Sequence, residues 1–406
     1  MRTITPEIFN ITTEGKPCRE FIHPWSPTCT QGIVEMVLSA IKGSGKFSLA
    51  LHTLQLLSKG KNLTKQHVKY VAESAIRMTL LGPGIGLIFV GISCLQIKLC
   101  GGYVYQICMS VPGFFSGAAI FLMQKAKRHY VISAFSSGAL ETFLTCYTPL
   151  NAGRQCYLKT QTFFFMVVNG AFLYLMKLWK TNKADKILPE IWFYSPSAEI
   201  SAKKTTEDRR KSISYHPCNH LNSCFRSILK ETSNYFWFGT ILEVLRITVS
   251  NFRTMIRNPR TIIKFIFKKS TLKLAAFASL YVFLYKVTNC LQCRLSGKDD
   301  ATNALVSGFV SGLSYYIHPN LSLALTAFTN LIHISWKYFN VNRYFGEFST
   351  SEVTFMFVVG FLFHYRMRVP DRCSRFFINI ISLATSGRSD EMFEAFLNSI
   401  PTTMIS

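Results

Sequence analysis

The amino-acid sequence predicts an all-α, polytopic helical membrane protein. We expect two homologous bundles of about four spans each, with amphipathic helices at the membrane surface. The first observation behind this is composition: the 406 residues are 49% apolar and 14% aromatic but only 16% charged, as is typical of membrane proteins. The second is that the apolar residues form blocks long enough to cross a bilayer as helices. The third is that motifs of the first half recur in the second.

The basic residues are distributed as in a membrane protein. The chain has 45 Lys and Arg against 21 Asp and Glu, a formal net charge of +24. These basic residues flank the apolar blocks, which favours contact with anionic headgroups of membrane lipids over nucleic-acid binding. Residues 1–30 lack the apolar core of a signal peptide, so we expect insertion through internal segments. The twelve cysteines follow no secreted-scaffold spacing, and we expect reduced thiols.

Two motifs occur twice, in the same order. Residues 94–101 read Cys-Leu-Gln-Ile-Lys-Leu-Cys-Gly, and residues 290–297 read Cys-Leu-Gln-Cys-Arg-Leu-Ser-Gly. Likewise, Gly-Phe-Phe-Ser-Gly at 113–117 recurs as Gly-Phe-Val-Ser-Gly at 308–312. The offsets are 196 and 195 residues, and chance similarity seldom keeps both order and spacing. The predicted organisation is a first repeat at 1–180, a polar basic linker at 181–215, a second repeat at 216–375 and an amphipathic C-terminal tail at 376–406.

The first repeat opens with a turn and continues with helices. Pro24 and Pro27 make the segment from His23 to Cys29 rigid and non-helical. The helical pattern at 31–57 is interrupted by charges and glycines, so it suits an amphipathic or shielded helix better than a lipid-exposed span. Four predicted spans follow, at 78–97, 103–123, 130–148 and 162–179.

The second repeat has the same order. His216-Pro217 opens it, and an impure apolar helix occupies 233–250. Five basic residues then fall three or four apart and would share one helix face against anionic headgroups, although an ordinary positive loop that sets topology is an equal alternative. These predicted lipid-headgroup residues are Arg253, Arg257, Arg260, Lys264 and Lys268. Four predicted spans follow, at 272–289, 301–317, 321–336 and 353–365.

The span count decides how the repeats are related. Four spans per repeat make the copies parallel, about an axis along the membrane normal, and put the basic segments on one face. The excess of basic residues makes that the cytosolic face if the membrane is the outer or single boundary of an organelle. If the interrupted first helix of each repeat also spans, the count rises from eight to ten and the copies are inverted.

Pairs of glycines four residues apart predict close helix packing. The absence of a side chain lets two helix backbones approach, although small residues are also simply common in membrane helices. The predicted helix-packing residues are Gly82, Gly86, Gly113, Gly117, Gly308 and Gly312.

Two polar residues lie inside predicted spans. A carboxylate at mid-span costs about 2 to 3 kcal/mol on insertion scales, so Glu141 should face the bundle or a wet cavity and find a partner. His333 lies at nearly the same depth of the other repeat. We therefore predict a Glu141–His333 pair, either as a structural hydrogen bond or as a proton or substrate gate.

The sequence supports no catalytic site and no cofactor. It contains no Gly-rich phosphate loop, no His-Glu-x-x-His and no Ser/His/Asp ordering. Cys290 and Cys293 have redox-like spacing, but they lie at a span's end outside a βαβ unit. Four residues are weak metal candidates because their spacing differs from that of usual zinc pairs: His216, Cys218, His220 and Cys224. The first repeat offers Cys18, His23 and Cys29. We expect no bound metal.

These motifs together resemble the transmembrane protein 135 family, also called peroxisomal membrane protein 52. The resemblance rests on the His-Pro-Trp-x-Pro-x-Cys segment at 23–29, the repeated Cys-Leu-x-x-[Lys/Arg]-Leu-x-Gly element and the Gly-Phe-Val-Ser-Gly-Leu-Ser run at 308–314. It covers nearly the whole chain through order and spacing, and that family is distantly similar to the channel subunits of the mitochondrial import translocases. One departure is His333-Ile334, where the family tends to repeat a Glu-Thr, so a role that needs two intramembrane carboxylates is in doubt.

The resemblance implies a multi-pass protein of mitochondrial and peroxisomal membranes without an established reaction. It is expected to influence mitochondrial fission–fusion balance, peroxisome organisation and lipid metabolism, with fission machinery on the cytosolic face as the expected partner. The alternative is a transporter or channel for a lipid or small metabolite at the repeat interface. A polar cavity containing Glu141 would favour the alternative, and dry glycine packing would favour the first function.

Overall fold

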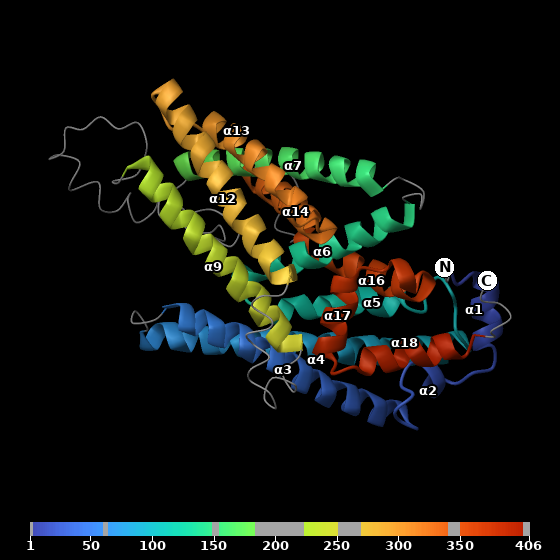
Figure 1. The fold of residues 1–406 in the computed structure, drawn as a ribbon. Helices are drawn as coiled ribbons and strands as arrows, with labels where there is room; N and C mark the ends of the chain where they lie inside the picture. Colours follow the sequence, from blue (N-terminus) through green and yellow to red (C-terminus); the bar gives the residue numbers. More distant parts are fainter. Residues whose placement is uncertain are drawn as a thin grey trace. The chain divides into compact units, whose positions relative to one another are not determined.

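The predicted all-α fold is confirmed. The computed structural model describes residues 3–59, 64–147, 154–182, 223–250, 269–339 and 350–400. Within these ranges the chain forms 14 α-helices with short 3-10 segments and no strand (Figure 1). The chain divides into two compact units, residues 1–149 with 345–406, and residues 150–344.

Unit 1 contains both ends of the described chain. Its two longest helices, α3 and α4, pack along each other, and α16 packs against α5 and α6. The helices of this unit are α1 (Pro6–Thr13), α2 (Cys18–Phe21), α3 (Cys29–Lys59), α4 (Lys65–Cys100), α5 (Ser110–Ser116), η2 (Gly117–Leu122), α6 (Lys125–Tyr147), α16 (Thr350–Arg368), η4 (Pro370–Arg372), α17 (Arg375–Ala384) and α18 (Arg388–Asn398).

Unit 2 has a similar packing pattern with fewer described helices. Its helix pair is α9 with α12, and α7 packs against α13 and α14. The helices are α7 (Arg154–Asn182), α9 (Cys224–Ser250), α12 (Lys269–Ser296), α13 (Ala301–Ser311), η3 (Gly312–Tyr316) and α14 (Leu321–Tyr338).

The repeated cysteine motif ends the longest helix of the first unit and its counterpart in the second. Gly101 caps α4 with φ +70°, and Gly297 follows α12 with φ +67°. Residues with side chains rarely adopt this left-handed conformation, which explains why both copies of the motif end in glycine. The motif is therefore a helix C-terminus that contains exposed leucines, and the first cysteine of each copy, Cys94 or Cys290, is half-buried or buried.

The compact units differ from the predicted repeats in one helix. In sequence α7 closes the first repeat, yet it packs in unit 2, and α16 closes the second repeat, yet it packs in unit 1. Figure 1 shows green α7 beside orange α13 and α14, and red α16 beside α5. The boundaries 1–180 and 216–375 thus describe the sequence motifs, whereas the compact units exchange their last helices.

The glycine pairs at 113/117 and 308/312 make the same kind of contact with α16 and α7, respectively. A Cβ at Gly117 would lie 2.6 Å from Cα of Met356, and a Cβ at Gly312 would lie 2.6 Å from Cα of Met166. One turn away, Gly113 lies against Gly360, and Gly308 against Gly170. Both α7 and α16 therefore present a Met-x-x-x-Gly ridge to a Gly-x-x-x-Gly partner, so the two docking surfaces are interchangeable in composition. In α4, the predicted packing residues Gly82 and Gly86 lie against Ser44 and Met36 of α3.

The structure supports part of the predicted set of spans, and the total of eight stays a prediction. Among the described residues, three helices are long and apolar enough to cross a membrane: Lys65–Cys100, Leu158–Leu178 and Thr271–Ser296. One predicted span is not a single helix: the window at 103–123 holds a turn-rich stretch before Ser110, and its helix becomes 3-10 at Gly117. Thirteen residues of this kind reach about 22 Å, short of the roughly 30 Å hydrocarbon core. The shorter apolar helices are Ser110–Leu122, Leu321–Trp336 and Arg375–Ala384.

The segment predicted as an amphipathic tail belongs to the core of unit 1. Helices α17 and α18 bury Phe377, Ile381 and Phe396. The ring of Phe396 lies 5.6 Å from that of Phe9 and 5.7 Å from that of Phe21, centroid to centroid. The N-terminal helices α1 and α2 are thereby packed against α18 through aromatic contacts.

A buried ion pair joins α6 to α16 within unit 1. Arg128 Nη1 lies 2.9 Å from Glu352 Oε1, with the side chains 17% and 3% exposed. Arg128 also donates to the carbonyl oxygens of Met123 and Phe121. We expect Arg128→Met to destabilise the protein by about 3–5 kcal/mol, because it leaves a buried carboxylate without its cation. Thermal unfolding in detergent measures the change.

The matched control is an exposed pair on α4. Arg77 lies 3.0 Å from Glu73, but these side chains are 47% and 51% exposed. Such a pair contributes about 0.3–0.5 kcal/mol, so Arg77→Met should leave the unfolding midpoint nearly unchanged. Equal midpoints for the two variants would contradict the structural importance of the Arg128 pair.

Candidate metal centre

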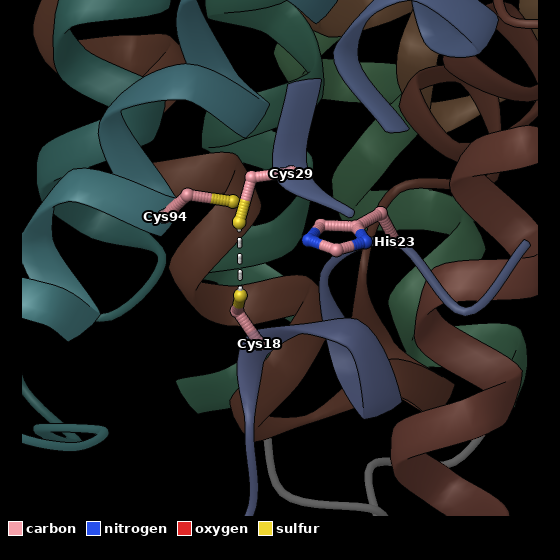
Figure 2. A group of neighbouring side chains, drawn as sticks. All are labelled: Cys18, His23, Cys29 and Cys94. Carbon is pink, nitrogen blue, oxygen red and sulfur yellow. Dashed lines mark hydrogen bonds between the residues drawn. The ribbon is translucent and has the colours of Figure 1, made fainter. Parts of the chain in front are cut away.

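Four metal-binding side chains meet where the N-terminal segment reaches the end of α4. Cys18 begins α2, His23 lies in the turn after α2, Cys29 begins α3, and Cys94 lies near the C-terminus of α4. One ligand atom from each lies within 4.8 Å of the others. Figure 2 shows the three thiols and the imidazole of His23 converging on one point.

Proline-rich sequence positions the first three residues. Pro17 is the N-cap of the short helix α2. Pro24 and Pro27 prevent helix from continuing between α2 and α3. The absence of a side chain at Gly32 leaves room for His23, because a Cβ there would lie 2.8 Å from Cβ of His23. The turn is closed by Trp25, whose Nε1 donates to the carbonyl oxygen of Gly32 at 3.3 Å.

The tautomer of His23 follows from its hydrogen bond. Nδ1 lies 3.0 Å from the carbonyl oxygen of Ser26, which can only accept, so Nδ1 carries the proton. Nε2 then holds a lone pair. The residue is 0% exposed, and Nε2 has no hydrogen-bond partner within the part of the chain that the structure describes. A buried imidazole with a free lone pair, whose other ring N–H is donated to a carbonyl oxygen, has the arrangement that metal-ligating histidines use.

The thiols are reduced and close together. Sγ of Cys18 lies 3.3 Å from Sγ of Cys29 in a hydrogen bond, and neither is in a disulfide. Burial, together with the hydrogen bond to Cys29, raises the pKa of the Cys18 thiol, so it is protonated at neutral pH when no cation is bound. Three thiols and one imidazole form a Cys₃His set, which is a common ligand set of structural zinc sites.

The antiparallel pair α3 and α4 explains why Cys94 joins the cluster. Helix α3 starts at Cys29 and α4 ends at Cys100, so the start of one helix lies beside the end of the other. Sequence reasoning named Cys18, His23 and Cys29 but missed Cys94. The available signal was its place in the repeated cysteine motif, combined with the hairpin that two long consecutive helices form.

Of the four weak metal candidates in the second repeat, the structure describes only Cys224. His216, Cys218 and His220 lie outside the described residues. Cys224 begins α9 and packs against Cys290 and Cys293 of α12, as Cys29 meets Cys94 in unit 1. However, Arg294 donates through Nη2 to Sγ of Cys224 at 3.1 Å. The described part of this cluster thus contains three cysteines and the guanidinium of Arg294.

The predicted intramembrane polar residues lie in different units. Glu141 is in α6 of unit 1, where Ser374 Oγ donates to its carboxylate at 2.6 Å. The neighbouring Thr142 Oγ1 accepts from the backbone N–H of Ser374 at 2.9 Å. His333 is in α14 of unit 2. The Glu141–His333 pair stays a prediction, and the five predicted headgroup residues between 253 and 268 lie outside the described ranges.

No protein-family model matches this chain, and no solved structure matches it. The fold and the site therefore define its class on their own. It is an all-α protein with helices able to cross a membrane, built from two units with exchanged helices, and with a Cys₃His cluster at the end of α4.

Proposed function

We propose that this chain is a non-enzymatic, multi-pass membrane protein of mitochondria and peroxisomes. In this proposal it regulates mitochondrial fission–fusion balance, peroxisome organisation and lipid metabolism through anionic lipids and fission machinery on its cytosolic face. The observation that carries the proposal is the combination of two features. Three apolar helices have spanning length, and the glycine pairs at 113/117 and 308/312 bring helix backbones into direct contact. The motif resemblance supplies the organelles and the process.

The surface of the helices supports a membrane location. Leu99 and Leu295, at corresponding positions of the repeated motif, are 76% and 80% exposed. Phe163 of α7 and Phe357 of α16 are 61% and 64% exposed. Exposure of large apolar side chains on several long helices is unfavourable in water but not in a lipid bilayer, so this surface suits a membrane.

The transporter alternative has less support. Unit 1 contains an open cavity between α3, α4, α6, α16 and α17, lined mainly by apolar side chains such as Met36, Phe89 and Phe363. Glu141 does not line it. This apolar cavity is not the polar path through Glu141 that transport would use.

Depletion of the chain should change mitochondrial length and peroxisome number, measured by fluorescence microscopy, and wild-type protein should restore both. A variant with all five predicted headgroup residues replaced by glutamine should insert but fail to restore them, since the basic segment can no longer bind anionic membrane. The positions are Arg253, Arg257, Arg260, Lys264 and Lys268.

The matched control exchanges lysine and arginine at the same five positions. It keeps the charge and should restore both organelles. The proposal is wrong if the tagged chain resides in neither organelle, or if depletion leaves both organelles unchanged.

A further inference from the structure

We propose that Cys18, His23, Cys29 and Cys94 bind one Zn²⁺ as a structural site. The ion would tie the N-terminal segment and the start of α3 to the end of α4. This inference is independent of the organelle in which the protein works.

The geometry is close to that of a loaded site. In tetrahedral zinc centres with Zn–S near 2.3 Å, neighbouring sulfurs lie about 3.8 Å apart. Here the Cys18 and Cys29 sulfurs are 3.3 Å apart, and all four ligand atoms lie within 4.8 Å. Adjustments of about 1 Å in side-chain position would complete the tetrahedron. The sulfur separation is also well beyond the roughly 2.05 Å of a disulfide.

The lone pair of His23 is the second, independent observation. Its Nδ1 proton is donated to the Ser26 carbonyl, so Nε2 is buried with a free lone pair. Metal-bound histidines regularly donate the other ring N–H to a carbonyl or carboxylate, which fixes the ring and its tautomer. His23 therefore has the hydrogen-bond arrangement of a ligand.

The ligand set selects the ion and its role. Three thiolates and one imidazole suit Zn²⁺, and four protein ligands leave no open position for water or substrate. Such a closed site stabilises structure. It binds with release of the thiol protons to solvent. The three N-terminal ligands lie within twelve residues, whereas Cys94 is 65 residues beyond Cys29, so the ion closes a long loop across the α3–α4 hairpin.

The first experiment is metal analysis of the full-length protein, purified in detergent under reducing conditions. Elemental mass spectrometry should find one zinc atom per chain fewer in Cys94→Ser than in wild type. The matched control is Cys290→Ser, which changes the corresponding cysteine of the second repeat and should leave the zinc content unchanged. Equal zinc content in wild type and Cys94→Ser would overturn the proposal.

The second experiment distinguishes ligation from folding. Wild-type protein loaded with Co²⁺ should show the visible d–d bands of a tetrahedral site together with a thiolate-to-cobalt charge-transfer band. His23→Cys should keep the metal with a shifted spectrum, because four thiolates also bind tetrahedrally. His23→Ala should lose the bands. A Cys18–Cys29 disulfide in protein purified without reductant, resistant to alkylation and lacking zinc, would also overturn the site.

Discussion

Gly117→Ala is expected to destabilise the protein by about 1–3 kcal/mol, and Gly312→Ala by a similar amount. A Cβ at either position would lie 2.6 Å from a backbone Cα, Met356 for Gly117 and Met166 for Gly312. A backbone atom cannot move aside as the end of a flexible side chain can, so the whole helix must shift, and overpacking of this kind costs about 1–3 kcal/mol. The roughly 1 kcal/mol that alanine gains over glycine applies to helix interiors, and it offsets less of this cost at Gly117 and Gly312, where an α-helix becomes 3-10.

The matched control for this prediction is Gly91→Ala in α4. Gly91 is also helical, but its nearest neighbour, Cδ1 of Ile33, lies 4.0 Å from the added Cβ. We expect this variant to be as stable as wild type or slightly more stable. The measurement is the midpoint of thermal unfolding in detergent, followed by size-exclusion chromatography. A stable Gly117→Ala variant would show that η2 and α16 do not pack backbone to backbone.

Periodicity and composition were sufficient for the fold class, because an apolar block of spanning length has few alternatives to a helix. They were also sufficient to single out Gly113, Gly117, Gly308 and Gly312, which all lie at helix contacts. They were insufficient for helix starts: hydropathy does not separate the turn-rich stretch before Ser110 from the helix that follows, because both are largely apolar. Helix boundaries depend on packing that a window of hydropathy does not contain.

The candidate site shows the same division between local and distant information. The turn that carries His23 and Cys29 could be recognised from its prolines alone. The repeated motif marked Cys94, but its proximity to Cys29 follows only when α3 and α4 are paired as a hairpin in the right register, a contact between residues 65 positions apart. The exchange of α7 and α16 was likewise hidden, since both helices offer the same Met-x-x-x-Gly ridge and similarity does not say which partner each one chooses.

Photocrosslinking should report the exchange of helices directly. Phe114 follows Gly113 in α5, and Phe309 follows Gly308 in α13, so the two positions correspond. The ring of Phe114 lies 4.8 Å from that of Phe357 in α16, and the ring of Phe309 lies 6.2 Å from that of Phe163 in α7. A benzophenone amino acid at position 114 should therefore label residues 350–368, and one at position 309 should label residues 154–182. Peptide mass spectrometry of the full-length protein in membranes identifies the labelled segment.

Sequential bundles would give the opposite labelling, with position 114 attached to residues 154–182 and position 309 to residues 350–368. That outcome would contradict the exchange of helices. A benzophenone at Phe225, which is 74% exposed, serves as the control and should give few protein crosslinks.

The mass of the crosslinked product separates two further cases. An exchange within one chain keeps the monomer mass, whereas an exchange between two chains gives a covalent dimer, because docking surfaces of equal composition also permit domain swapping. The contacts described here lie within one chain and correspond to the monomer mass.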